Sequence, residues 1–242
     1  MSSGVIVPSS SPWRHKIVVV PKNDGGYRLT VNYKPLYSCT VFNAYPFPHV
    51  DDLLKKLGGA KVMSTFDFSQ FYHQIPLVSE NQEKSAFFYG KVHHFTRCPF
   101  GLRNAVALCC SVMAKVFEPF DNVVVYLDDI VVFGQTEEEH NELLTRVLER
   151  IRDLGLCLNK KKCHFNQSKI SFLGYEIENG VIRPDESRCE PVCSFPLPTC
   201  VRSLQRFVGM MTYYSRYIPS FSEKVKCLYD KMNDFGDWTD KN

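Results

Sequence analysis

The sequence predicts an α+β fold built on a mixed or antiparallel sheet. Strand-like and helix-like patterns alternate irregularly from about residue 15 to residue 180. Within this region, residues 123–133 (VVVYLDDIVVF) contain two β-branched apolar runs separated by two acids, which predicts a β-hairpin with its turn at Asp128 and Asp129. After Pro184 the pattern becomes mainly helical. We therefore expect a sheet-bearing domain followed by a helical segment.

Composition places the chain among globular proteins. Of its 242 residues, 44% are apolar and 23% are charged, and the net charge is only +3, which favours a polyanionic partner weakly. None of the ten cysteines forms a CxxC pair, which argues against a zinc finger and favours reduced thiols in an intracellular protein. The chain contains no apolar run of eighteen residues and no signal-peptide pattern at residues 1–16. We expect a soluble cytoplasmic or nuclear protein without a membrane partner.

In the first third of the chain, a Ser- and Pro-rich stretch, residues 1–14, predicts an extended N-terminal arm. Runs at 16–20 and 27–31, joined through Asn-Asp-Gly-Gly, predict a hairpin that carries Lys22 and Arg28. This hairpin is equally consistent with a phosphate-binding finger and with an ordinary solvated surface. Residues 50–57 predict a short helix that stops at Gly58 and Gly59, and residues 62–68 predict a strand that carries Asp67 at its end.

The rest of the chain continues the alternation. Residues 85–96 predict a strand pair turned at Tyr89-Gly90-Lys91, and residues 104–117 predict a helix so apolar on all sides that it should be buried. Residues 137–154 predict an amphipathic helix with Thr136 as its N-cap. Residues 200–214 and 222–232 predict helices that mix basic and aromatic residues. That mixture suits a nucleic-acid backbone, although aromatic residues at helical spacing more often form core.

Three acids at strand ends carry the chemistry. Asp128 and Asp129 are adjacent, and two like charges about 4 Å apart repel by about 4 kcal/mol at an effective dielectric of about 20. Divalent cations would relieve this repulsion, because carboxylate oxygens are the ligands that Mg²⁺ prefers. An acid pair alone is usually a solvated turn, and a lone Asp at a strand end is usually a cap. Asp67 together with the pair, however, matches a two-metal phosphoryl-transfer site.

Six ordered blocks carry a family resemblance: residues 45–77, PFGLRNA (99–105), YLDDI (126–130), LNKKKCHF (158–165), FLGY (172–175) and residues 202–222. The chain resembles reverse transcriptases, and within them the polymerases of gypsy-type LTR retrotransposons, from about residue 12 to residue 232. The resemblance implies an RNA-directed DNA polymerase with the right-hand fold, in which an antiparallel palm sheet bears the catalytic carboxylates. It places the fingers and palm in residues 15–180 and a helical thumb in residues 181–232.

The resemblance also implies roles for individual residues. Asp67, Asp128 and Asp129, with the backbone carbonyl of Phe68, would bind two Mg²⁺ ions, and Mn²⁺ is an alternative. The residues implied to contact the incoming deoxynucleoside triphosphate are Lys22, Arg28, Tyr72, Phe100 and Gly101, with Tyr72 excluding a 2′-hydroxyl. The primer grip would consist of Phe172, Leu173, Gly174 and Tyr175. One of Lys160, Lys161 and Lys162 would protonate pyrophosphate. The implied macromolecular partner is an RNA or DNA template with its primer.

The chain departs from the family pattern in places. Val106 replaces a Pro, Cys109 and Cys110 replace Phe-Gln, and Asn32 stands where Asp is common. Residues 233–242 resemble the truncated start of an RNase H-like domain, so we expect a fragment of a polyprotein that lacks its RNase H and integrase domains. Two alternatives to a polymerase stay open at this point. One is a catalytically inactive nucleic-acid-binding remnant, and the other is a two-metal nuclease that uses the same acids.

Overall fold

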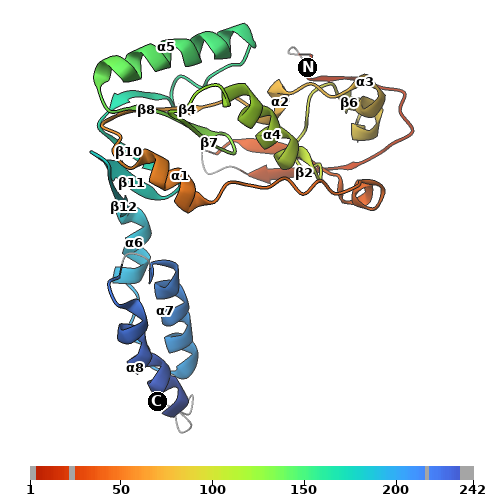
Figure 1. Cartoon of the computed structure of the whole chain (residues 1–242). Coiled ribbons are helices and arrows are strands. Elements are labelled where there is room, and N and C mark those ends of the chain that lie inside the picture. The colour runs from red at the N-terminus through yellow and green to blue at the C-terminus, as the bar shows by residue number, and fades with distance from the viewer. Residues whose placement is uncertain (1–3, 22–24, 216–217, 235–242) are drawn as a thin grey trace. The chain divides into compact units, whose positions relative to one another are not determined.

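The chain divides into two compact units, residues 1–168 and residues 169–242 (Figure 1). The computed structural model describes residues 4–21, 25–215 and 218–234. Strands and helices alternate in the first unit, whereas three strands precede three helices in the second. All the strand pairs within the sheets are antiparallel. The predicted α+β class is therefore confirmed.

A four-stranded sheet forms the centre of the first unit. Its order is β7-β8-β4-β9, with the bounds Val123–Tyr126, Asp129–Gly134, Val62–Asp67 and His164–Gln167. Helices α4 (Ala105–Phe117) and α5 (Glu137–Asp153) share one hydrophobic cluster with side chains of β4, β7 and β8. Helix α1 (Val50–Leu57) contacts β7, and Figure 1 shows it on the side of the sheet opposite α5. The sheet is thus covered on both faces.

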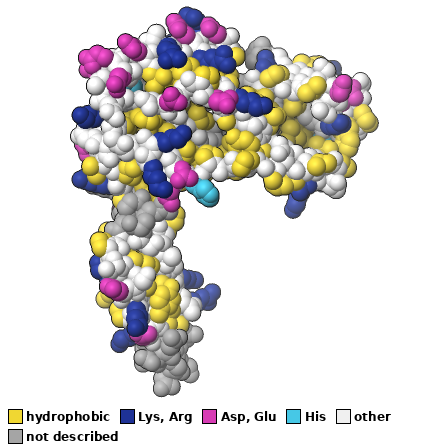
Figure 2. Space-filling view, in the orientation of Figure 1, with side chains coloured by type: hydrophobic (Ala, Val, Ile, Leu, Met, Phe, Trp, Pro, Cys, Tyr) yellow, Lys and Arg dark blue, Asp and Glu magenta, His cyan; other side chains and the backbone are white. Residues whose placement is uncertain are grey.

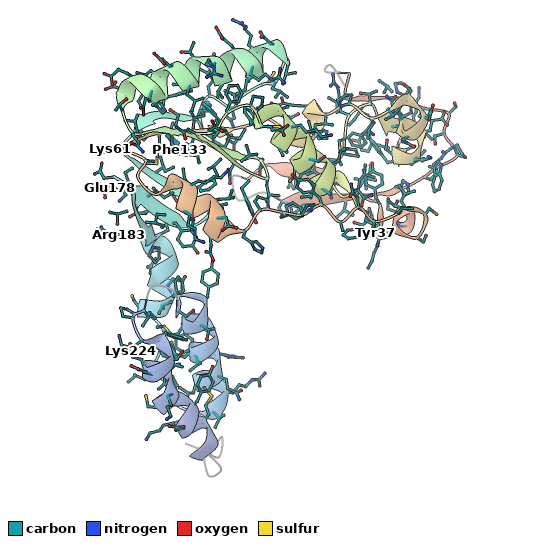
Figure 3. All side chains as sticks on the ribbon, in the orientation of Figure 1. Tyr37, Lys61, Phe133, Glu178, Arg183 and Lys224 are labelled. Carbon is teal, nitrogen blue, oxygen red and sulfur yellow. The ribbon has the colours of Figure 1, made fainter. Side chains whose placement is uncertain are left out.

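The alternation of side chains along β4 determines where its acid points. Ser64 and Phe66 face the helices, because Ser64 Oγ lies 3.0 Å from His140 Nε2 of α5 and Phe66 belongs to the cluster shared with that helix. Asp67, the next residue, therefore faces the other side of the sheet. Lys61 and Phe133 mark the far end of β4 and β8 (Figure 3). The carboxylate thus lies at one end of the sheet, beyond its apolar interior.

The predicted helices begin and end where their local signals indicated. Thr136 Oγ1 accepts a hydrogen bond of 3.2 Å from Glu139 N at the start of α5, as its N-cap role requires. Helix α1 buries its leucines and ends at Gly58, as predicted. The helix predicted at residues 104–117 packs against the sheet as expected, through Cys109, Met113 and Phe117, although Val106 and Leu108 are 40% and 42% exposed. The sheet covers only one face of α4, and the apolar pattern of the sequence does not indicate how much of the helix surface the sheet covers.

Smaller elements complete the first unit. A three-stranded sheet has the order β1-β6-β5, and β2 pairs with β3. The bounds are β1 (Ile6–Pro8), β2 (Lys16–Pro21), β3 (Tyr27–Asn32), η1 (Lys34–Cys39), α2 (Phe71–Gln74), α3 (Ser79–Gln82), η2 (Glu83–Ser85), β5 (Phe87–Tyr89) and β6 (Lys91–Phe95). A second core joins them through Val31, Tyr33, Leu36, Phe87 and Phe95. The N-terminal stretch contributes β1, whose Ile6 pairs with Phe95.

The second unit begins with an antiparallel sheet and continues as helices. Its elements are β10 (Lys169–Phe172), β11 (Tyr175–Glu178), β12 (Val181–Pro184), α6 (Glu186–Cys193), α7 (Val201–Tyr213) and α8 (Phe221–Asp234). Leu204, Val208 and Val225 form its core, against which Phe207 packs, whereas Tyr213 is exposed. Figure 2 shows Lys and Arg side chains projecting from this helical part, and Arg202, Arg206, Lys224, Lys226 and Lys231 are exposed.

The sequence also predicted the nature of residues 233–242 and the absence of a membrane-spanning helix. The stretch assigned to an RNase H-like start, residues 233–242, falls mostly outside the described residues, which end at 234. Among the described residues no helix combines the length and the apolar character that a bilayer crossing requires. The ranges that the sequence assigned to fingers, palm and thumb remain proposals.

Buried histidines predict that acid destabilises the fold. Burial lowers the pKa of His15, His73 and His140 below the ordinary value of 6.5. Below pH 6.5 the unfolded chain gains protons that the folded chain resists, so stability is lost as the pH falls toward the lowered pKa values. We expect the free energy of unfolding to fall between pH 7.5 and pH 5.5, by up to about 1.4 kcal/mol per pH unit for each histidine. The urea midpoint should fall with it. Replacing the exposed His49 by Gln should leave this slope unchanged, and a pH-independent midpoint would contradict the assignment.

Candidate active site

The hairpin of β7 and β8 presents two of the three acids. Tyr126 pairs with Asp129, so Leu127 and Asp128 form the two-residue loop, and the predicted turn at Asp128-Asp129 was wrong by one residue. Leu127 adopts a φ of 57°. A positive φ at the first loop residue alone is the pattern of a type II′ turn, which matches the twist of a hairpin but is unusual for leucine. The hairpin therefore holds Asp128 at its tip in a conformation that costs about 1–3 kcal/mol.

The third acid lies directly across the sheet. Asp67 ends β4 and is the register partner of Asp129 at the start of β8. Partial burial of its carboxyl raises the pKa of Asp129, and the charges of Asp128 and Asp67 raise it further, while Lys162 lowers it. The structure thus brings the three predicted acids into one electrostatic group at one end of the sheet.

Lys162 neutralises part of this negative charge. Its Nζ lies 3.1 Å from Asp67 Oδ2 in a largely exposed ion pair. The sequence left open which of Lys160, Lys161 and Lys162 approaches the site, and the contact with Asp67 selects Lys162. Its role toward pyrophosphate remains a prediction.

The donor chemistry of the three acids fits hard divalent cations. Carboxylate oxygens are the ligands that Mg²⁺ prefers, and all three side chains of the site are carboxylates. In the part of the chain that the structure describes, however, no three His, Cys, Asp or Glu side chains are already arranged to hold a metal ion. The acids fit such ions in kind and would have to draw together around them.

Phe68 could contribute only its backbone to such a site. Its side chain is buried, with its ring centroid 5.7 Å from that of Phe71. Its main chain pairs with Leu158, and Asn159 N donates to Asp67 O over 2.8 Å. The loop after α5 therefore supports the backbone on which Asp67 and Phe68 lie.

Aromatic rings form a platform beside the acids. Tyr72 lies in α2, whose N-cap Gln70 has a φ of 48°. The ring centroid of Tyr72 lies 4.8 Å from that of Phe100. Burial, together with neighbouring thiols and Asp128, raises the pKa of Tyr72 to about 12, so its hydroxyl stays neutral. Gly101 has a φ of 92°, and a Cβ there would meet Val31 O at 3.2 Å. The predicted trio Tyr72, Phe100 and Gly101 is thus contiguous.

His73 also belongs to this platform, and the sequence analysis missed it. Its ring stacks on Phe95 at 5.8 Å and meets Phe100 edge-on at 5.4 Å. Its Nδ1 is the one buried side-chain nitrogen or oxygen among the described residues without a hydrogen-bond partner. Its position directly after Tyr72 was the available signal.

Cys110, one of the departures from the family pattern, lies next to the hairpin of β7 and β8. Burial raises the pKa of the Cys110 thiol, and the nearby backbone of Leu127 lowers it. Cys109 and Cys110 are both buried in α4. The smaller side chain at this position therefore retains a contact with the turn that carries Asp128.

The remaining predicted residues fall on β3, in the second unit or outside the described residues. Arg28 lies on β3 opposite Val20, and Lys22 falls outside the described residues. The predicted primer grip lies in the second unit, where Leu173 and Gly174 form the two-residue turn between β10 and β11. Both have a positive φ, of 52° and 82°, which is the pattern of a type I′ turn. Phe172 and Tyr175 flank this turn and are buried.

An apolar cavity of the first unit does not coincide with the acids. A cavity of about 520 Å³ lies between η1 and the start of α4, lined by Leu36, Leu77, Leu102 and Leu108 among others. Tyr37, labelled on η1 in Figure 3, donates a hydrogen bond of 3.1 Å to Gly101 O. Asp67, Asp128 and Asp129 are not among the residues that line this cavity.

Lys162 carries a testable expectation for the site. Without its charge the pKa of Asp129 should rise further, because Lys162 lowers it while burial and two acids raise it. We therefore expect Lys162→Met to move the acidic limb of any metal-dependent rate to higher pH. A pH–rate profile checks this, with Lys160→Met as the control because Lys160 is exposed in the same loop. Identical acidic limbs for Lys162→Met and the unmodified chain would contradict the coupling.

Comparison with known proteins gives this geometry a context. A family model described as "Reverse transcriptase (RNA-dependent DNA polymerase)" matches residues 20–177. The Pol polyprotein of transposon 297 from Drosophila melanogaster is 32% identical over 93% of this chain, which covers 22% of that relative. The enzymatic polyprotein of cauliflower mosaic virus (strain Strasbourg) is 35% identical over 97% of this chain, which covers 36% of it. The chain thus spans about a fifth to a third of the length of these relatives.

Solved structures show the same fold. The foamy viral protease-reverse transcriptase dRH in complex with double-stranded DNA matches with a TM-score of 0.84 at 26% identity, covering 95% of this chain and 41% of that one. The foamy viral protease-reverse transcriptase bound to an RNA/DNA hybrid matches with a TM-score of 0.75 at 26% identity, covering 96% and 31% of the two chains. The predicted resemblance to retrotransposon reverse transcriptases and the predicted right-hand polymerase fold are confirmed.

Proposed function

Because this chain belongs to the reverse transcriptase family, we propose that it is an RNA-directed DNA polymerase domain that adds deoxynucleotides to a primer 3′-hydroxyl. The observation that carries the proposal is the meeting of Asp67, Asp128 and Asp129 at one end of the central sheet. Two separate segments of the chain supply these acids, and a fold without such chemistry would gain nothing from their repulsion.

Asp67, Asp128 and Asp129, together with the Phe68 carbonyl, would hold two Mg²⁺ ions, and Mn²⁺ could take their place. When bound, such ions lower the pKa of the attacking hydroxyl and neutralise charge on the triphosphate. The chain contributes orientation: Asp67 and Asp129 are fixed as cross-strand partners, and the hairpin turn fixes Asp128. Lys162 lies beside Asp67 and could donate a proton to a departing oxygen.

The aromatic platform suits the sugar and base of an incoming deoxynucleoside triphosphate. The rings of Tyr72 and Phe100 pack at a tilt of 58° beside Asp128, and Gly101 allows close approach of the backbone. Arg28 and Lys22, on or after the strands of the β2–β3 hairpin, would bind the triphosphate. This platform favours a polymerase over a nuclease, because simple hydrolysis requires no surface for a nucleoside.

An RNA or DNA template with its primer is the proposed macromolecular partner. The exposed Lys and Arg residues of α7 and α8 supply positive charge for a phosphate backbone. The foamy viral relatives were solved with double-stranded DNA and with an RNA/DNA hybrid, which supports this partner class. The FLGY turn, residues 172–175, is the proposed primer grip.

One observation favours a second candidate, an inactive nucleic-acid-binding remnant. The acids of the described structure are not already arranged around a metal position, and Cys109 and Cys110 replace family residues behind the hairpin. The two candidates differ in whether the acids still draw together around cations. Only an active enzyme would extend a primer.

Primer extension on a poly(rA)/oligo(dT) duplex with Mg²⁺ decides between them. We expect the unmodified chain to extend the primer and the Asp128→Asn variant to fail, while both bind the duplex at low salt. Binding without extension by either chain would replace the polymerase with the remnant. Extension by both would remove the metal role from Asp128.

A further inference from the structure

One glutamine side chain joins two segments that lie far apart in the sequence. Gln74, the last residue of α2, donates from Nε2 to Ser69 O over 2.5 Å and to Cys157 O over 2.8 Å. Its Oε1 accepts from Cys157 N, also over 2.8 Å. A single amide thus satisfies both backbone groups of Cys157, as a neighbouring strand would.

The segment that Gln74 holds surrounds the end of β4. Ser69 N donates to Cys157 O over 2.9 Å, and Leu158 pairs with Phe68. Two residues later, Asn159 N donates to Asp67 O over 2.8 Å. The residues around Cys157 therefore determine the backbone position of Asp67.

The same segment also reaches the Asp67 carboxylate. Lys162 N donates to Asn159 O over 2.9 Å, and Lys162 Nζ lies 3.1 Å from Asp67 Oδ2. The Cys163 thiol also contacts Asp67 O at 3.8 Å. Residues 157–163 consequently hold Asp67 by its carbonyl and by its side chain.

This segment is held by partial packing against the core and by hydrogen bonds to its backbone. It lies between α5 and β9, follows Gly155 at a φ of 65°, and exposes Cys157, Lys160, Lys161 and Lys162 to solvent. Leu158 and Cys163 pack against the main core, but the segment forms no regular strand, so the hydrogen bonds to its backbone also set its position. Gln74 supplies two of these bonds, both to Cys157, while its third bond, to Ser69 O, anchors the amide, and none of the three involves an acid of the site.

We propose that Gln74 is a positioning residue for the metal site: it fixes residues 157–162 and thereby holds Asp67 and Lys162 in the arrangement that divalent cations require. The inference rests on the proposed metal role of Asp67. Partners that orient a metal ligand typically contribute tenfold to a hundredfold to metal affinity or activity. Removing the Gln74 amide should therefore raise the Mg²⁺ concentration for half-maximal rate by about tenfold.

The test compares Gln74→Met with Gln82→Met in the full chain. Both changes remove a half-buried amide and keep the side-chain volume, but Gln82 donates to Leu77 O over 3.0 Å, away from the acids. Hydrogen exchange of residues 155–163, measured without metal, reports on the segment itself. Primer extension over a range of Mg²⁺ concentrations reports on the site.

We expect faster exchange at residues 155–163 and a raised Mg²⁺ requirement for Gln74→Met alone. Faster exchange with an unchanged Mg²⁺ requirement in Gln74→Met would give Gln74 a purely structural role and overturn the proposal. Unchanged exchange in Gln74→Met, or an equal shift of the Mg²⁺ requirement in Gln82→Met, would also overturn it. If Gln74→Met does not fold, Gln74→Glu, which keeps the acceptor for Cys157 N, is judged by the same two readouts. No extension by the unmodified chain would instead contradict the proposed function, while the exchange result would still decide whether Gln74 holds the segment.

Discussion

Replacing Asp129 by Asn is expected to abolish primer extension, by about a thousandfold or more, without lowering the melting temperature. Loss of a metal ligand removes several kcal/mol of transition-state stabilisation, and about 1.4 kcal/mol corresponds to a factor of ten in rate. The fold should tolerate the change because Asp129 faces the like charges of Asp67 and Asp128, and because partial burial already raises its pKa. Removing its charge relieves both costs.

The combination of lost activity and retained stability distinguishes a functional acid from a structural one. Thermal unfolding and single-turnover primer extension are measured on the same preparation of Asp129→Asn. Asp153→Asn is the matched control, because Asp153 is an exposed acid whose pair with Arg152 should contribute little. If Asp129→Asn keeps more than a tenth of the primer-extension rate, or melts at a much lower temperature than the unmodified chain, Asp129 is not a metal ligand of the kind proposed.

Elements with strong local signals could be predicted from the sequence to within a residue or two. Helix α5 combines an apolar stripe, three acids in its first turn and a Thr136 N-cap, all of which act within one or two helical turns. Helix α1 has acids at its start, lysines at its end and Gly58 after it. Local interactions determine where such helices begin and end, so local patterns are sufficient.

The hairpin turn shows where local pattern misleads. Leu127 is apolar and follows a β-branched run, so the sequence places it in the strand. In the structure it occupies the turn, because pairing Tyr126 with Asp129 closes the ladder with two residues left over. A positive φ at leucine opposes its intrinsic preference, and only the register of the two strands can impose it.

The supporting residues of the site escaped prediction for a different reason. Gln74 acts on Cys157, 83 positions later in the sequence, and Lys162 acts on Asp67, 95 positions earlier. Three consecutive lysines showed that positive charge reaches the site, but the loop conformation selects Lys162. Such contacts depend on how β4, α2 and the loop after α5 come together, which no periodicity in the sequence records.

The second large effect concerns the choice of sugar. We expect Tyr72→Ala to reduce the preference for deoxynucleotides over ribonucleotides by about a hundredfold, the range that one poorly fitting group in a pocket can provide. The Tyr72 ring lies between Phe71 and Phe100, with centroid distances of 5.6 and 4.8 Å, so it has little freedom to retreat from a 2′-hydroxyl. Its removal would open that space.

The matching variant Tyr72→Phe separates the ring from its hydroxyl. Because the pKa of Tyr72 is raised to about 12, the hydroxyl adds no charge beside Asp128 at neutral pH, and the ring itself must provide the exclusion. Tyr72→Phe should therefore keep the preference for deoxynucleotides that Tyr72→Ala loses, as measured by kcat/KM for matched deoxy- and ribonucleoside triphosphates. An equal loss of the deoxynucleotide preference in both variants would assign sugar selection to the Tyr72 hydroxyl. If neither variant loses the preference, Tyr72 does not select the sugar, and the neighbouring Phe100 and Gly101 become the candidates for that role.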